Sequence, residues 1–178
     1  MNDRFINEYT NPLRIYEFVN SYRLVNSLMK MRKIIIYTDG GSRGNPGPAA
    51  IGTIFCNERG EIFKKYSQYL GDGLTNNEAE YQAVIFALNK FKSLFGKKLA
   101  QNSDIEIKSD SELLVNQLNG KYKILTPKIQ SFFLTIWNLK LDFKSIKFRF
   151  ISREKNKEAD RLVNEVLDSQ ARQNFLKI

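Results

Sequence analysis

The order of strand-like and helical runs is the feature of this sequence that most restricts its fold. Three strand-like runs come first, and helical and strand-like runs then alternate toward the C-terminus. The strand-like runs are 33–38, 49–57, 61–70, 104–109 and 145–151, and the helical runs are 75–95, 111–118, 127–141 and 156–175. Hairpins join antiparallel strands, whereas crossovers through helices join parallel ones. The sequence therefore predicts an α/β fold with a mixed five-stranded sheet, three antiparallel meander strands then two parallel strands, flanked by helices.

The region before residue 32 carries an additional amphipathic pattern. Pro12 stands where helices often begin, and apolar side chains follow it at spacings of three and four. These side chains are Ile15, Phe18, Tyr22, Val25 and Met29. The pattern predicts an N-terminal amphipathic helical extension over residues 1–31, followed by a main domain over residues 32–178. Three roles for the extension stay open: packing on the domain, association with another molecule, or an upstream start, since Met29 and Met31 directly precede the first strand.

The charge balance indicates a class of partner. A formal net charge of +9 and an isoelectric point near 9.6 favour a polyanion, with membrane surfaces as the second class. No apolar run approaches the ~20 residues that cross a bilayer, and the first residues lack the apolar core of a signal peptide. We therefore expect a cytoplasmic protein that binds a polyanion and no membrane.

Cysteine and histidine usage restricts the chemistry. A single cysteine, Cys56, excludes an internal disulfide, and the absence of histidine excludes zinc sites built on histidine and Ser-His or Cys-His catalysis. Any reaction must therefore use carboxylates, hydroxyls, amides and bound ions.

Four carboxylates occupy positions where a metal site could form. Asp39 and Asp110 each follow a strand-like run, whereas Glu80 and Asp160 lie in helical runs. In open α/β sheets, sites collect at the carboxyl ends of neighbouring strands. Three of the four also have ordinary explanations: Asp39 suits a turn, Asp110 lies in a capping-box sequence, and Asp160 suits a helix surface.

Glu80 has the weakest ordinary explanation. The apolar side chains that share its helical face are Val84, Leu88, Phe91 and Phe95. Glu78 is expected on the polar face of the same helix, together with Gln82, Asn89 and Lys92. Glu80 should therefore point inward, where an ionised carboxylate requires a cation or hydrogen-bond donors. This reasoning favours a metal-binding or catalytic role.

Four short segments, in their order along the chain, resemble the type 1 ribonuclease H family. The segments are Thr38–Pro48, Thr75–Glu80, Ser109–Ser111 and Asn156–Asp160. The resemblance covers about residues 32–170, and it implies that residues 32–178 form a ribonuclease H catalytic domain. It also implies endonucleolytic hydrolysis of the RNA strand of an RNA/DNA hybrid by two Mg²⁺ ions, with Mn²⁺ as a substitute, leaving 5'-phosphate and 3'-hydroxyl ends.

The resemblance assigns roles to the four carboxylates. Asp39 would bridge the two ions, Glu80 and Asp110 would hold the side that stabilises the leaving group, and Asp160 would hold the side that positions the attacking water. Hard divalent cations prefer oxygen ligands, so this chemistry needs no histidine.

Substrate recognition is expected from the glycine-rich loop and the start of the long helix. The expected substrate-binding residues are Gly40, Gly41, Ser42, Asn45, Thr75, Asn76, Asn77 and Glu112. Glycines permit close approach to a ribose edge, and short polar side chains can read 2'-hydroxyls. An ordinary turn explains the loop equally well, and a helix cap explains Thr75. The resemblance favours a phosphate of the DNA strand at Thr75 and Asn76, whereas the role of Glu112, where the family often has glutamine, stays open.

The sequence departs from the family pattern in several places. The loop histidine of many members is absent, so Arg153 or Glu154 would take its auxiliary role if it is kept. The segment after Asp110 is too short for a Trp- and Lys-rich protrusion, which leaves Trp137 as an expected core residue. Seven basic residues against one acidic residue between 113 and 150 indicate a basic track. The N-terminal extension lacks the tryptophan and glycine pattern of a hybrid-binding domain.

Two other functional classes remain open. A non-catalytic or regulatory nucleic-acid-binding module of the same fold would keep the basic surface and lose a carboxylate, but all four are present. A reverse-transcriptase-associated nuclease domain or related polynucleotidyl transferase would share the quartet, although the Gly44–Gly47 loop favours ribonuclease H. Cleavage of RNA/RNA duplexes and the oligomeric state, with the N-terminal helix as a candidate contact, stay open.

Overall fold

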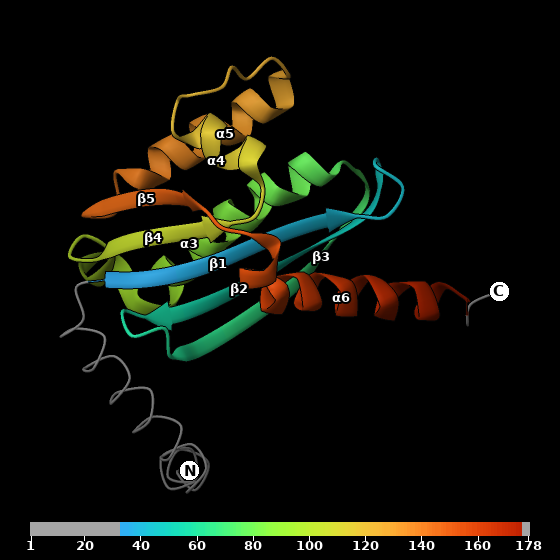
Figure 1. Ribbon diagram of the computed structural model, residues 1–178, viewed down its shortest axis with the longest axis horizontal. Coiled ribbons are helices and arrows are strands. Elements are labelled where there is room, and N and C mark those ends of the chain that lie inside the picture. The colour runs from blue at the N-terminus through green and yellow to red at the C-terminus, as the bar shows by residue number, and fades with distance from the viewer. Residues whose placement is uncertain (1–32, 176–178) are drawn as a thin grey trace, which may run out of the picture. The chain divides into compact units, whose positions relative to one another are not determined.

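The computed structural model describes residues 33–175, which form a five-stranded sheet with helices on both faces (Figure 1). The strands are β1 (Lys33–Ser42), β2 (Gly47–Asn57), β3 (Ile62–Leu74), β4 (Asp104–Ser109) and β5 (Ser145–Phe150). The helices are α3 (Asn76–Ala100), α4 (Glu112–Leu118), α5 (Pro127–Lys140), the 3-10 turn η1 (Arg153–Lys155) and α6 (Lys157–Phe175). The strand order is β3-β2-β1-β4-β5, which confirms the predicted mixed sheet. The N-terminal helix predicted over residues 1–31 lies outside the described residues.

Strand β1 lies at the centre of the sheet and carries the first carboxylate. It pairs antiparallel with β2, where Asp39 lies opposite Gly52, and parallel with β4, where Tyr37 lies opposite Lys108. The sequence placed the end of this strand at residue 38, but β1 continues to Ser42 because its pairing with β2 continues to that residue. Asp39 is therefore a residue within a strand rather than a turn residue.

Helices α3 and α6 lie on opposite faces of the sheet (Figure 1). Helix α3 packs on β1 and β2 and is covered in turn by α5, whereas α6 packs on β2, β1 and β3. The largest fully buried side chains between α3 and the sheet include Tyr81, Leu88, Phe91, Ile36 and Ile107. Within residues 33–175, no helix is long and apolar enough to cross a membrane.

Two glycines set how closely these helices approach the sheet. A Cβ atom at Gly40 would lie 2.2 Å from the carbonyl carbon of Ala79 on α3. A Cβ atom at Gly52 would lie 2.4 Å from the carbonyl oxygen of Ala159 on α6. Both positions require glycine because the neighbouring atoms are backbone atoms. The close approaches place Glu80 and Asp160, the residues after Ala79 and Ala159, beside the strands.

Two sequence-based expectations about side chains were wrong. Trp137 is half exposed, with 51% of its surface accessible, because α5 buries Ile129 and Ile136 and the next residue points about 100° away from that line. Glu78 does not lie on a solvated face: it is buried, it accepts a hydrogen bond from the backbone N–H of Thr75, and it pairs with Lys128 of α5 at 3.0 Å.

Candidate active site

The parallel pairing of β1 and β4 brings Asp39 and Asp110 together. Tyr37 of β1 and Lys108 of β4 are partners in the register. Asp39 stands two residues after Tyr37 and Asp110 two residues after Lys108, so the alternation of side chains directs them to the same face as these partners. Burial, followed by the charges of Asp110 and Asp160, raises the pKa of Asp39 from 3.8 to about 7. A backbone hydrogen bond from Gly40 and the charge of Arg153 lower the pKa of Asp39, but burial and the two carboxylates outweigh them.

Glu80 reaches the same place from the first turns of α3. Its Oε2 accepts a hydrogen bond of 2.5 Å from Ser111 Oγ, which also caps α4 by accepting from the N–H of Leu114. Burial is the main cause that raises the pKa of Glu80 from 4.5 to about 7, and the charges of Asp39 and Asp110 raise it further. The hydrogen bond from Ser111 lowers it. Glu80 thus faces the aspartates, as the helical pattern predicts.

Asp160 completes the group from the first turn of α6. Its carboxylate accepts from Arg153 at 3.4 Å and from Asn164 at 3.1 Å, and its charge is one cause of the raised pKa of Asp39. Arg153 therefore touches the site, at the position expected for an auxiliary residue. Glu154 is exposed, and bonds from its own backbone N–H and from Ser152 lower its pKa.

Asn156 is a site residue whose contacts the sequence did not predict. Its Nδ2 donates to the carbonyl oxygen of Thr38 at 3.1 Å and to Oδ1 of Asp110. The side chain is 1% exposed, and its Oδ1 has no hydrogen-bond partner among the described residues. Asn156 thereby ties β1 to the aspartate that follows β4. The only sequence signal for this role was the position of Asn156, four residues before Asp160 and at the end of a short polar turn.

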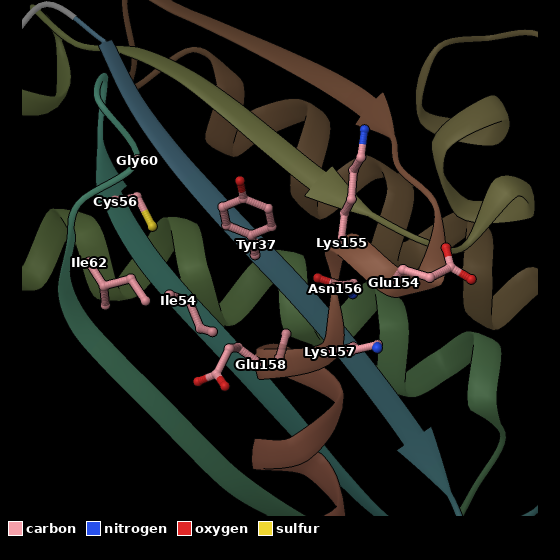
Figure 2. A pocket seen from close by; sticks show the side chains of 11 residues that line it. Tyr37, Ile54, Cys56, Gly60, Ile62, Glu154, Lys155, Asn156, Lys157 and Glu158 are labelled. Carbon is pink, nitrogen blue, oxygen red and sulfur yellow. The ribbon is translucent and has the colours of Figure 1, made fainter.

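Figure 2 shows where this turn lies in relation to the sheet. Glu154, Lys155 and Asn156 border a hollow of about 200 Å³ whose other walls include Tyr37 and Cys56. Tyr37 stands out from β1 beside the turn, so the hollow opens next to the strand that carries Asp39.

The four carboxylates supply the chemistry of a divalent-cation site. Among residues 33–175, no three acidic or cysteine side chains are gathered closely enough around one point to form a closed ligand set. The carboxylates of Glu80, Asp110 and Asp160 instead accept hydrogen bonds from neighbouring side chains. The oxygen-only donors and the raised pKa values of Asp39 and Glu80 fit Mg²⁺ or Mn²⁺, because a hard cation would compensate the burial of these carboxylates and the repulsion between them, which together raise the pKa values.

The raised pKa values of Asp39 and Glu80, caused first by burial and then by nearby carboxylates, predict a pH-dependent stability of the metal-free protein. Folded Asp39 and Glu80 keep their protons to about pH 7, whereas the unfolded chain releases them near their ordinary pKa values. The folded state therefore binds more protons between these limits, and stability falls as pH rises, by up to about 1.4 kcal/mol per pH unit for each group. Asp39→Asn should stabilise the metal-free protein, and by more at pH 7 than at pH 5.

Thermal melts in a chelator across this pH range would measure the effect, and added Mg²⁺ should reduce the advantage of the variant. A difference in melting temperature between wild type and Asp39→Asn that stays constant from pH 5 to pH 7 would contradict the prediction.

The expected substrate-binding residues meet at the junction of the β1–β2 loop and α3. The backbone N–H of Ser42 donates to Asn76 Oδ1 at 2.7 Å, and the N–H of Asn76 donates to Asn45 Oδ1 at 2.9 Å. Thr75 is the N-cap of α3 and forms a capping box with Glu78, which confirms the cap explanation for this residue. The structure therefore brings the loop and the helix start into one surface.

Three further expected residues have different surroundings. A Cβ atom at Gly41 would lie 3.1 Å from Val163 of α6, so this glycine faces α6 while Gly40 faces α3. Asn77 Oδ1 is buried without a hydrogen-bond partner among the described residues. Glu112 is exposed in the first turn of α4, where it accepts only a 3.5 Å hydrogen bond from Asn116. No described contact joins Glu112 to the loop surface.

Comparison with known proteins identifies the family. A family model described as reverse transcriptase-like matches residues 37–166. LC11-RNase H1 from compost, solved in complex with an RNA/DNA hybrid, is 45% identical over 78% of this chain and 99% of that chain, with a TM-score of 0.73. RNase H1 of the archaeon Halobacterium salinarum is 36% identical over 77% of this chain and 98% of the solved chain, with a TM-score of 0.70.

Other relatives set the limits of the comparison. A bifunctional protein of Mycobacterium tuberculosis is 33% identical over 140 residues, but the match spans only 36% of that longer protein. The match spans 65% of the full ribonuclease HI of Halobacterium salinarum. A foamy viral protease-reverse transcriptase is 22% identical with a TM-score of 0.58, a likeness of fold alone. From the match to nearly the whole of the solved RNase H1 chains, the chain belongs to the type 1 ribonuclease H family.

Proposed function

We propose that this protein hydrolyses the RNA strand of RNA/DNA hybrids endonucleolytically. The observation that carries the proposal is the mutual influence of four carboxylates: Asp110 and Asp160 act on buried Asp39, and Asp39 and Asp110 act on buried Glu80, so that the pKa values of Asp39 and Glu80 are raised. A family relative that is 45% identical has been solved with such a hybrid, which supports the substrate class.

The carboxylates would hold two Mg²⁺ ions, with Mn²⁺ as a substitute. Divalent cations at such a site activate water and stabilise the leaving 3' oxygen of an in-line displacement. Asp39 is proposed as the ligand shared by both ions because it lies on the central strand and the charges of both Asp110 and Asp160 act on it. Glu80 and Asp110 would serve the leaving-group side, and Asp160 the side of the attacking water. Arg153 would assist Asp160 through the contact described above.

The loop surface would recognise the hybrid. Gly40 and Gly41 continue the strand that carries Asp39, where the lack of side chains would let the hybrid approach the backbone, and Ser42 and Asn45 would offer polar groups beside them. Asn77, whose buried Oδ1 has no hydrogen-bond partner within residues 33–175, would contribute an acceptor for a 2'-hydroxyl. Thr75 and Asn76, at the N-terminus of α3, would bind a phosphate of the DNA strand, and Glu112 would contact the RNA.

The strand that is cut and the ends that remain test this function. Labelled RNA/DNA hybrid should be cut in its RNA strand only with Mg²⁺ present, leaving 5'-phosphate and 3'-hydroxyl ends, because water attacks and the ribose 3' oxygen departs. RNA duplex, DNA duplex and single strands serve as comparison substrates in the same gel assay. Products that end in 2',3'-cyclic phosphates would show attack by the ribose hydroxyl and overturn the site assignment.

We also propose that residues 32–178 carry the whole catalytic activity. Every residue of the proposed site follows residue 32, whereas the apolar side chains at helical spacing in residues 1–31 contribute none. A protein that begins at Met29 should cleave hybrid as well per folded molecule as the full chain does. If the apolar stripe has a partner, the truncation should also lower the melting temperature or change the oligomeric state, since each buried side chain contributes ~1.5 to 3 kcal/mol.

Kinetics, thermal melts and light scattering on the two proteins measure these outcomes. A truncated protein that melts like its parent but cannot cut hybrid would assign the N-terminal segment to the substrate site.

A further inference from the structure

Within residues 33–175, none of the helices packs on the α6 face of β4 and β5. Helix α6 packs on β2, β1 and β3, and in Figure 1 it crosses the sheet away from β4 and β5. Helix α4 contacts β4 and β5 from the other side, since Ile105 and Ile107 of β4 are buried in the core there. Among residues 33–175, therefore, the α6 face of β4 and β5 is formed mainly by side chains of the strands themselves.

The register arranges these side chains in two rows. The row nearest the carboxylates contains Tyr37, Lys108 and Arg149, and the next contains Ile35, Glu106 and Lys147. Lys33 lies beyond them on β1 and pairs with Glu106, which also meets Arg149 at 3.3 Å. Although burial opposes them, the charges of Lys33, Lys108 and Arg149 all lower the pKa of Glu106. The Lys33 and Arg149 side chains are nevertheless 49% and 69% exposed, which leaves both accessible to a ligand.

The first row is continuous with the proposed active site. Asp39 stands two residues beyond Tyr37 on β1, a rise of about 6.6 Å, and Asp110 stands two residues beyond Lys108, directly after the end of β4. The charge on this sheet face therefore changes from negative at the aspartates to positive at Lys108 within two residues along the strands. A polyanion that reached the carboxylates would meet the cations of this row directly.

Tyr37 adds an aromatic surface to the row of cations. Lys108 Nζ lies 5.1 Å from the centre of the Tyr37 ring and 3.5 Å from its hydroxyl. On its other side the ring borders the hollow seen in Figure 2, whose walls include Ile54, Cys56 and Lys155. Cations that follow a backbone, combined with an aromatic ring on which a base can stack, are the features that bind single-stranded nucleic acid.

We propose that the β4–β5 sheet face, defined by Tyr37, Lys108, Lys147 and Arg149, binds an unpaired nucleic-acid strand that continues from the hybrid held at the carboxylates. This proposal rests on the proposed function. Phosphates of the unpaired strand lie along Lys108, Arg149 and Lys147, and a base packs at Tyr37. The protein would accordingly prefer hybrids that end in a single-stranded extension over blunt hybrids of equal length.

The test compares binding of blunt and extended hybrids by the full chain. Fluorescence anisotropy without divalent cations would measure the affinity of one hybrid, either blunt or extended by unpaired thymidines or uridines at each of its four ends in turn. At least one extension should raise the affinity by about fivefold or more, since a stacked base contributes ~1 to 3 kcal/mol. Lys147→Gln/Arg149→Gln should remove this gain and leave binding of the blunt hybrid unchanged.

A matched control and a second readout keep the result interpretable. Lys97→Gln/Lys98→Gln removes the same charge from exposed positions at the far end of α3 and should keep the gain. For the extended hybrid, the slope of log affinity against log salt should fall by about 1.4 in the first variant and stay unchanged in the control, because each lost phosphate contact on a single strand is worth about 0.7.

Equal affinities for blunt and extended hybrids, or equal salt slopes in both variants, would overturn the proposal. Cleavage of the blunt hybrid by wild type in Mg²⁺ is measured alongside. If the blunt hybrid is cut but the extension has no effect, only this inference fails. If wild type does not cut the blunt hybrid, the proposed function fails as well.

Discussion

Asp110→Asn should abolish cleavage of RNA/DNA hybrid while hybrid binding persists. The substitution keeps the volume of the side chain but removes one negative charge that Asp39 and Glu80 both experience. Loss of a required metal ligand normally lowers turnover by orders of magnitude, because the cations supply most of the stabilisation of the reacting oxygens. Single-turnover cleavage in Mg²⁺ and anisotropy binding of the same hybrid measure the two quantities separately.

Asp142→Asn provides the matched control for this substitution. Asp142 pairs with Lys92 behind the sheet, so the control removes an equal charge and an ion pair without touching the proposed site. It should cleave hybrid like wild type. Turnover of Asp110→Asn within about threefold of wild type would contradict the two-metal reading.

Asn156→Ala should lower the cleavage rate by about 10- to 100-fold, the usual effect of losing a group that orients a metal ligand. The side chain touches Asp110 through Nδ2 and holds the carbonyl oxygen of Thr38, the residue before Asp39. Its removal frees both aspartates to move, so the Mg²⁺ concentration for half-maximal activity should also rise. Asn156→Asp should be more damaging than the alanine, because it places a further carboxylate against Asp110.

The Mg²⁺ dependence of cleavage distinguishes a role of Asn156 in positioning the aspartates from a simple loss of protein stability. Asn102→Ala deletes a similar hydrogen bond, to the carbonyl oxygen of Lys98 at the surface, and serves as the control. Both alanine variants should be assayed well below their melting temperatures. An unchanged Mg²⁺ midpoint and rate in folded Asn156→Ala would show that the asparagine has a structural role alone.

The elements of the fold were largely predictable because their signals are local. Alternating β-branched residues predicted β4 with the bounds that the structure has, Asp104–Ser109, and Pro127 correctly marked the start of α5. The strand order follows from the sequence of hairpins and crossovers, whose handedness leaves few arrangements. The positions of Asp39 and Asp110 near one another follow from that order, because Asp39 lies in β1 and Asp110 directly follows β4, its parallel neighbour.

The burial of a side chain and its hydrogen-bond partners depend instead on what packs against it. The sequence by itself did not determine these contacts. The carboxylate of Glu78 is buried because it closes a capping box and Lys128 of α5 comes to meet it. Trp137 is exposed because the neighbouring residue, Ile136, occupies the core. Asn156 hydrogen-bonds both to Thr38, which lies 118 residues earlier in the chain, and to Asp110, which lies 46 residues earlier. Spacing along a chain specifies periodicity and caps, whereas contacts between distant residues exist only once the sheet has assembled.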